Sequence, residues 1–177
     1  MTATLNQEQL KNYIRDIPDF PKKGILFKDI TPLLKDPQAF RTAVDLLAER
    51  FSDCGVEQVV GIESRGFIFA AAVAYELKAG FIPVRKKGKL PSVTEKISYQ
   101  LEYGEDILEI HQDSIEKGMK VLLIDDLLAT GGTASAVCKL VKKLGGVVAG
   151  IGFLIELSFL QGRDKLKGFE PHALITF

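Results

Sequence analysis

The chain has 177 residues, 46% of them hydrophobic and 26% charged, and its 23 Lys and Arg residues balance its 23 Asp and Glu residues. This length suits one domain with a single sizeable core. The zero net charge argues against a dedicated nucleic-acid binder, which usually carries a large basic excess, and no apolar run reaches the roughly 20 residues of a membrane-spanning helix.

The cysteines and the N-terminus indicate a cytoplasmic protein. Cys54 and Cys138 are the only cysteines, and they show neither metal-site spacing nor a disulfide framework. We therefore interpret both cysteines as reduced thiols of a protein in a reducing cytosol. Residues Met1–Gln9 lack the basic-then-apolar pattern of a secretion signal.

The N-terminal third begins with short, punctuated segments. Thr4–Gln7 fits a capping box, which predicts a helix running through Arg15. Proline and glycine interrupt Asp19–Lys35, which favours an ordered loop. Pro37–Ser52 has its apolar residues on one face and predicts an amphipathic helix.

Apolar strands then alternate with helices. This alternation is typical of an α/β fold with a mostly parallel central sheet flanked by helices. Helices are predicted over Gly66–Lys78 and Thr133–Leu144, the second ended by Gly145-Gly146. Strands are predicted over Gln58–Ile62, Phe81–Val84, Lys120–Ile124, Val147–Ile155 and Ala173–Thr176.

Lys86–Gly104 breaks this alternation. It is rich in lysine, serine and threonine and has little apolar periodicity. An irregular stretch of about 20 residues in a compact domain is usually a functional lid or a disordered segment. We favour the lid.

The stretch Val121–Ala134, VLLIDDLLATGGTA, carries the clearest chemistry. An apolar strand ends in two acids, and a turn rich in glycine and threonine then leads into a helix. Free backbone N–H groups and the helix dipole at such a turn bind a phosphate, and glycine lets the backbone approach the phosphate oxygens.

The same stretch excludes two common nucleotide-binding motifs. It contains neither G-x-x-x-x-G-K-[ST] nor G-x-G-x-x-G. Carboxylates beside a phosphate turn would repel the phosphate unless they face another group, and a ribose diol is the natural candidate. Taken singly, Asp126 could equally cap a turn, but the whole run favours a ribose 5-phosphate site.

Four apolar residues, two acids, two apolar residues and then A-T-G-G-T resemble the phosphoribosyl pyrophosphate signature of the type I phosphoribosyltransferases. The resemblance covers about Ile17 to Phe169 and implies that family's fold, with an N-terminal hood (residues 1–35) and a flexible catalytic lid (residues 86–104) in one domain (residues 1–177). It also implies that Asp125 and Asp126 hold the ribose hydroxyls. The expected 5-phosphate loop is Ala129, Thr130, Gly131, Gly132 and Thr133.

Three features are similar to the adenine phosphoribosyltransferases in particular. Ala129 stands where many hypoxanthine/guanine members carry an acid. Tyr99–Gly104, YQLEYG, matches a run whose glutamate handles the proton, which points to Glu102 as a catalytic residue. Phe20–Leu34 matches the hood that reads adenine, and its matching positions are Leu26, Phe27 and Lys28.

Further positions follow from the same resemblance. Glu63–Phe67, ESRGF, follows a strand as the family's pyrophosphate loop does, which implies a catalytic role for Arg65 and binding of pyrophosphate by Ser64, Arg65 and Gly66. The lid lysines Lys86, Lys87 and Lys89 would neutralise the leaving group. Leu157 would pack against adenine.

The family also implies Mg²⁺ carried by phosphoribosyl pyrophosphate, without a dedicated protein metal site, and a homodimer. The expected partners are adenine, phosphoribosyl pyrophosphate and AMP, with no nucleic acid and no membrane. Two alternatives remain open. One is a phosphoribosyltransferase for another purine base, and the other is a regulator with this fold that only senses the ligand.

Overall fold

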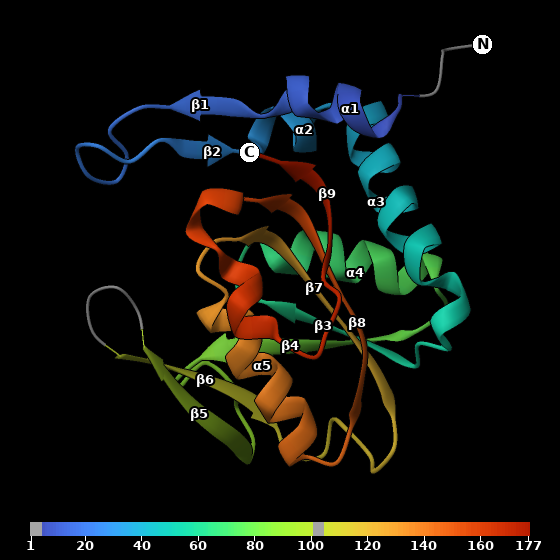
Figure 1. The fold of residues 1–177 in the computed structure, drawn as a ribbon. Coiled ribbons are helices and arrows are strands. Elements are labelled where there is room, and N and C mark those ends of the chain that lie inside the picture. Colours follow the sequence, from blue (N-terminus) through green and yellow to red (C-terminus); the bar gives the residue numbers. More distant parts are fainter. Residues whose placement is uncertain (1–4, 101–104) are drawn as a thin grey trace.

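A seven-stranded sheet forms the centre of the protein in a computed structural model that describes residues 5–100 and 105–177 (Figure 1). The strand order is β5-β6-β4-β3-β7-β8-β9. From β4 to β9 neighbouring strands run parallel, and the antiparallel β5-β6 pair extends the edge at β4. The strands are β3 (Gln58–Ile62), β4 (Gly80–Lys86), β5 (Thr94–Gln100), β6 (Glu105–His111), β7 (Lys120–Leu128), β8 (Val147–Glu156) and β9 (His172–Thr176). The predicted α/β fold with a mostly parallel sheet is confirmed.

Helices cover both faces of this sheet (Figure 1). Helices α3 (Pro37–Phe51) and α4 (Gly66–Glu76) lie on one face and α5 (Gly132–Lys143) on the other. Side chains of β7 alternate between the two cores: Leu122 and Ile124 join the α3/α4 cluster, whereas Val121 and Leu123 join the α5 cluster. Among the described residues, no helix is long and apolar enough to cross a membrane.

Most predicted elements agree with the structure to within two residues at either end. Among the strands predicted for the main sheet, β7 differs most, because it continues four residues beyond the predicted end at Ile124. Gly145 ends α5 as expected, with a positive φ of 92° and its N–H donated to the Lys142 carbonyl. Three short 3-10 helices complete the core region: η2 (Ser52–Cys54), η3 (Ser158–Leu160) and η4 (Gly162–Leu166).

The N-terminal segment forms a separate small layer, which we call the hood. Its described elements are α1 (Gln7–Leu10), η1 (Lys11–Tyr13), β1 (Arg15–Ile17), β2 (Phe27–Asp29) and α2 (Thr31–Lys35). Strands β1 and β2 form a two-stranded antiparallel sheet that lies beyond the end of the main sheet in Figure 1.

Two sequence predictions for the hood are wrong. The capping box is formed by Asn6 and Gln9, and Thr4 lies outside the described residues; the first helix also stops before Arg15, because Arg15–Ile17 pairs with Phe27–Asp29 instead. For the same reason Asp19–Lys35 is not only a loop, since it contains β2 and α2. Sequence-local signals could not reveal a strand whose partner lies twelve residues away.

The predicted irregular lid is also partly regular. Within it, Thr94–Gln100 forms β5, which pairs with β6 through seven residue pairs. Strand β6 was not predicted at all. Ile97 and Tyr99 of β5 pack against the α5 cluster, so burial of one face of this hairpin explains its order.

Candidate active site

The candidate site lies where the strand order of the parallel sheet reverses direction. From β3 the chain passes to β4 on one side, whereas β7 is followed by β8 on the other side. The carboxyl ends of β3 and β7 therefore diverge and leave a crevice, the place where open α/β sheets bind ligands. Helices α4 and α5 both begin at this crevice.

Asp125 and Asp126 lie inside β7 rather than after it, which corrects the sequence prediction. Pairing with β3 ends at Ile124, but pairing with β8 continues to Leu128. The two acids are therefore held rigidly by β8 on one side and face the loop after β3 on the other.

Burial disfavours the charged form of both carboxyl groups. Burial, and then the neighbouring charge of Asp126, raise the pKa of Asp125 well above its ordinary value. Burial also raises the pKa of Asp126, while the Arg65 guanidinium opposes that rise. Asp126 Oδ2 is buried and accepts no hydrogen bond of good geometry among the described residues, although the Arg65 guanidinium is its ion-pair partner.

Arg65 connects the acids to the hood. Its Nε lies 2.8 Å from Asp126 Oδ2, and its guanidinium lies 5.1 Å from the centroid of the Phe27 ring. The predicted pyrophosphate, ribose and base residues therefore meet at one side chain.

The predicted phosphate loop forms the start of α5. Gly131 precedes the helix with φ +75°, and no side chain caps the first turn, so the amides of that turn are available to an anion. A β-carbon on Gly131 would collide with the carbonyl oxygen of Gly162. A cavity of about 80 Å³ lies between this loop, Asp125 and Phe153.

The first turn of α4 faces the same crevice. It also lacks a side-chain cap, and a β-carbon on Gly66 would collide with Asp125 Oδ1. Glycine here lets the acid and the helix start approach each other. A second cavity, of about 340 Å³, is lined by Ser64, Arg65, Lys86, Tyr99, Asp125, Asp126, Thr133 and neighbouring residues.

Of the predicted lid lysines, Lys86 and Lys89 are held by acids. Lys86 Nζ lies 3.0 Å from Asp106 Oδ2, and this contact raises the pKa of Lys86. Lys89 and Arg85 both pair with Glu63, which also accepts the Lys86 backbone N–H. These contacts place Lys86 at the cavity but direct the Lys89 amino group to Glu63.

Glu63 and Tyr99 are site residues to which the sequence analysis gave no role. Glu63 is the first residue after β3, and its position in ESRGF was the available signal. Tyr99 lines the same cavity as Thr133 of the predicted phosphate loop, and burial raises the pKa of Tyr99, an effect that the Thr133 side chain opposes. The alternation of Ile97 and Tyr99 with Lys96, Ser98 and Gln100 could have revealed its strand.

Comparison with known proteins agrees with this geometry. Residues 30–168 match the family model of the phosphoribosyl transferase domain. The adenine phosphoribosyltransferase of Christiangramia forsetii is 59% identical over 169 residues, which are 96% of this chain and 99% of that protein.

Solved structures are equally similar. The crystal structure of adenine phosphoribosyltransferase from Thermoanaerobacter pseudethanolicus has a TM-score of 0.94 and 53% identity, and the match covers 97% of this chain and all of that one. The Saccharomyces cerevisiae enzyme, complexed with an imino-altritol bisphosphate and adenine, has a TM-score of 0.89 and 40% identity over 95% of this chain and 97% of its own. The chain belongs to the adenine phosphoribosyltransferase family.

The residues predicted to meet adenine in this phosphoribosyltransferase come from two places, the hood around β2 and the residue that follows β8. Phe27 contacts Phe20 edge-to-face at 5.1 Å, and Leu26 is 49% exposed. Leu157 follows β8 and donates its N–H to the Leu128 carbonyl. These three positions stay predictions as adenine contacts.

Lys28 differs from the other three. Its side chain is buried, donates to Asp16 Oδ1 at 2.6 Å and lies 3.7 Å from the Phe177 ring centroid. In this phosphoribosyltransferase only its backbone remains available to a base. Glu102 lies outside the described residues, and its role stays a prediction.

Proposed function

We propose that the protein transfers the 5-phosphoribosyl group from phosphoribosyl pyrophosphate to adenine, giving AMP and pyrophosphate, as in purine salvage. The observation that carries this proposal is the crevice at which two uncapped helix starts, an acid pair and the hood converge through Arg65. The names of the relatives and the adenine in the yeast complex support the choice of base.

The start of α5 binds the 5-phosphate in this proposal. Backbone amides from Ala129 to Thr133 and the hydroxyls of Thr130 and Thr133 donate to its oxygens. Asp125 and Asp126 accept hydrogen bonds from the ribose hydroxyls, which satisfies the buried Oδ2 of Asp126. The ribose carbon that reacts then faces the loop after β3.

The leaving pyrophosphate lies on the second helix start. Amides of Ser64 to Gly66 and the guanidinium of Arg65 donate to it, and Lys86 contributes positive charge from the cavity wall. The Lys89 amino group, which pairs with Glu63 in this structure, leaves that acid and binds a pyrophosphate oxygen instead. These contacts strengthen as charge develops on the leaving group, which is how preorganised donors lower a barrier.

The base approaches from the hood. Phe27 and Leu157 pack on the ring of adenine, and backbone groups of Leu26 and Lys28 hydrogen-bond its edge. As N9 of adenine forms a bond to C1 of the ribose, the bond from C1 to pyrophosphate breaks. Glu102 hydrogen-bonds N7 and handles the proton of the base, and the lid closes over the reactants to exclude water.

Magnesium fits this site as an ion carried by the substrate. The buried Asp126 Oδ2 has Arg65 as its ion-pair partner but accepts no well-aligned hydrogen bond among the described residues, and Asp125 and Asp126 are the acids that would face the cation. Mg²⁺ usually keeps several waters and binds substrate phosphates with one or two carboxylates. When bound, it neutralises charge on the pyrophosphate.

The remaining expectations concern the whole molecule. We assign residues 1–177 to one phosphoribosyltransferase domain, with hood and lid as its base-binding and covering parts. A homodimer is supported by large apolar side chains exposed on α4, with Ile68 near its start and Tyr75, 82% exposed, near its end. A reducing cytoplasm suits Cys54 and Cys138, which are both free thiols.

A pyrophosphate-release assay tests this function. Adenine, hypoxanthine, guanine and xanthine are each supplied with magnesium and phosphoribosyl pyrophosphate. Adenine is expected to give the highest kcat/KM. A preference for another base would support the nearest alternative enzyme, and no release with any base would favour the ligand-sensing regulator.

A further inference from the structure

Strand β5 and helix α5 contact each other along one face. At the active-site end, Tyr99 and Thr133 line the cavity of about 340 Å³ together. At the far end, Lys143 Nζ donates to Glu95 Oε1 at 2.8 Å. The lid hairpin and the helix that begins at the phosphate loop are therefore close together at the active-site end and joined by an ion pair at the far end.

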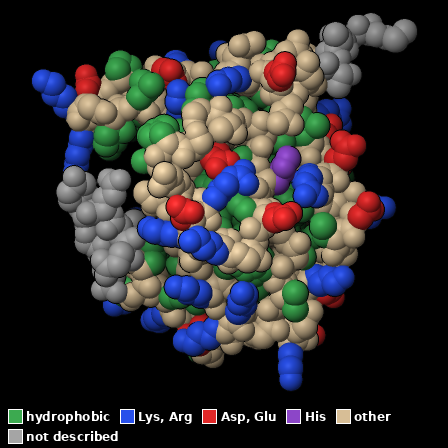
Figure 2. Space-filling model, viewed as in Figure 1, with side chains coloured by type: hydrophobic (Ala, Val, Ile, Leu, Met, Phe, Trp, Pro, Cys, Tyr) green, Lys and Arg blue, Asp and Glu red, His purple; other side chains and the backbone are tan. Residues whose placement is uncertain are grey.

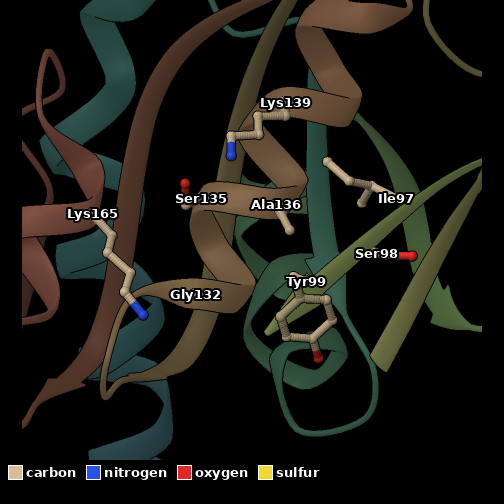
Figure 3. Close-up of a pocket in the computed structure, with 8 residues that line it drawn as sticks. All are labelled: Ile97, Ser98, Tyr99, Gly132, Ser135, Ala136, Lys139 and Lys165. Atoms are coloured by element: carbon tan, nitrogen blue, oxygen red, sulfur yellow. The ribbon is translucent and has the colours of Figure 1, made fainter. Parts of the chain in front are cut away.

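Between these two contacts the surfaces separate and leave a groove of about 300 Å³. Figure 3 shows its residues: Ile97 and Tyr99 on the β5 side, Ser135 and Lys139 on α5, and Lys165 from η4. Gly132 lies at its inner end, so the groove adjoins the phosphate loop from outside the crevice.

The charge of this groove is unbalanced. Its lining includes two lysines, two serines and no acid. Within residues 5–100 and 105–177, neither Lys139 nor Lys165 makes an ion pair, although Lys143 one turn further along α5 has Glu95. Glu95 of β5 thus pairs with Lys143, but no acid of the groove lining faces Lys139 one helical turn earlier.

The groove also divides into a polar and an apolar half. In Figure 3 Lys139 and Ser135 project from one side of α5, and Lys165 points toward its first turn at Gly132. Ile97 and the Tyr99 ring lie on the opposite wall. Amino and hydroxyl groups suit phosphate oxygens, and the apolar wall suits a sugar or a planar ring. A volume near 300 Å³ is at the lower end of small-ligand sites.

We propose that this groove is a second anion site, which shares Gly132 and Tyr99 with the wall of the catalytic crevice but lies outside it, and that it binds the phosphate monoester of a small organic molecule. The phosphate lies among Lys139, Ser135 and Lys165, and the organic part lies on Ile97 and Tyr99. A ligand there contacts the lid strand and the phosphate-loop helix together, so it stabilises their contact.

Isothermal titration calorimetry with AMP, and separately with ribose 5-phosphate, tests the site directly. The full chain is expected to bind two molecules of each. In an Asp125→Asn/Asp126→Asn variant the site in the crevice is weakened and the groove site remains, so binding in the groove is measured whether or not the proposed reaction is correct.

Lys139→Glu and Lys165→Glu, made singly in that variant background, are each expected to weaken the remaining site by about tenfold or more, which corresponds to 1.4 kcal/mol. Lys117→Glu is the matched control, because Lys117 is an exposed lysine beyond the opposite end of α5. Lys139→Gln, which only removes a charge, gives a smaller loss. A single site per chain, or a second site unaffected by both reversals, would overturn the proposal.

Discussion

The phosphate side and the base side of the crevice are built very differently. Strand β7 has partners on both edges, and its apolar residues from Val121 to Ile124 are at most 1% exposed. Strand β2 has one partner, pairs through three residues and stands beside half-exposed Phe20 and Leu26. The proposed sugar-phosphate site is thus part of the core, whereas the proposed base site rests on a thin layer attached to it.

This difference has a functional meaning. If the proposed phosphate and ribose contacts are correct, they need little adjustment, since the sheet holds these residues in place before the ligand arrives. Base contacts and the lid are attached through a few polar pairs, such as Lys28 with Asp16 and Lys86 with Asp106. Substitutions on the two sides should therefore change different kinetic constants.

The largest effect is expected from the lid. Glu102→Gln keeps the size of the side chain but removes its ability to take a proton, so kcat should fall by about 10²- to 10⁴-fold. Phosphoribosyl pyrophosphate binding should stay nearly unchanged, because none of its proposed contacts involves Glu102. Steady-state kinetics and a binding titration measure the two quantities, and wild-type turnover would remove Glu102 from the chemistry.

A glycine pair compares the two sides directly. Gly131→Ala and Gly24→Ala both add a methyl group at positive φ, +75° and +88°, but only the first meets another group, the Gly162 carbonyl. We expect a loss of about 1 kcal/mol in unfolding free energy for Gly24→Ala and about 3 kcal/mol for Gly131→Ala.

Only Gly131→Ala should also weaken phosphoribosyl pyrophosphate binding. Urea unfolding and a binding titration check both variants. Equal losses at the two positions would contradict the contrast between a packed phosphate loop and an open hood.

Asp125→Asn is expected to separate stability from binding. Because burial raises the pKa of Asp125, the folded protein holds a proton that the unfolded chain releases above about pH 3.9. Its contribution to stability therefore falls as pH rises from the unfolded-state pKa through the folded-state pKa, and stays low above it.

The Asp125→Asn variant has no carboxyl group at this position, so its stability lacks the decrease with rising pH that Asp125 causes. It should melt at a higher temperature than the parent at neutral pH, with the difference shrinking toward acidic pH, while ribose binding weakens. Melting curves from pH 4 to pH 8 measure the trend. An Asp125→Asn protein that melts lower at neutral pH would refute the electrostatic explanation.

The smallest effect is expected from Lys28→Met. The substitution removes the buried ammonium group between Asp16 and Phe177 while keeping the volume of the side chain. The hood should shift slightly, so the KM for adenine should rise a few-fold and the KM for phosphoribosyl pyrophosphate should not change. Asp16→Asn is the matched control, and a change in both KM values would show that the hood does not act on the base alone.

Much of the fold was predictable because its signals are local. An apolar run followed by glycine and threonine predicts β7 and α5 whatever surrounds them, and the alternation of strands and helices predicts a parallel sheet. The hood strands and β5 were missed because their order depends on pairing partners and on one buried face. Glu63 and Tyr99 gained roles only through neighbours that are distant in sequence.

The sequence by itself determined the class of fold, the turn rich in glycine and threonine from Ala129 to Thr133 and the presence of the acid pair, because residue type and spacing within one short segment decide them. Tertiary structure decided that the acids lie within β7, that Arg65 joins Asp126 to Phe27, and that the Lys28 side chain is buried against Asp16 and Phe177. Such contacts follow from packing and desolvation between distant segments, and spacing along the chain does not encode them.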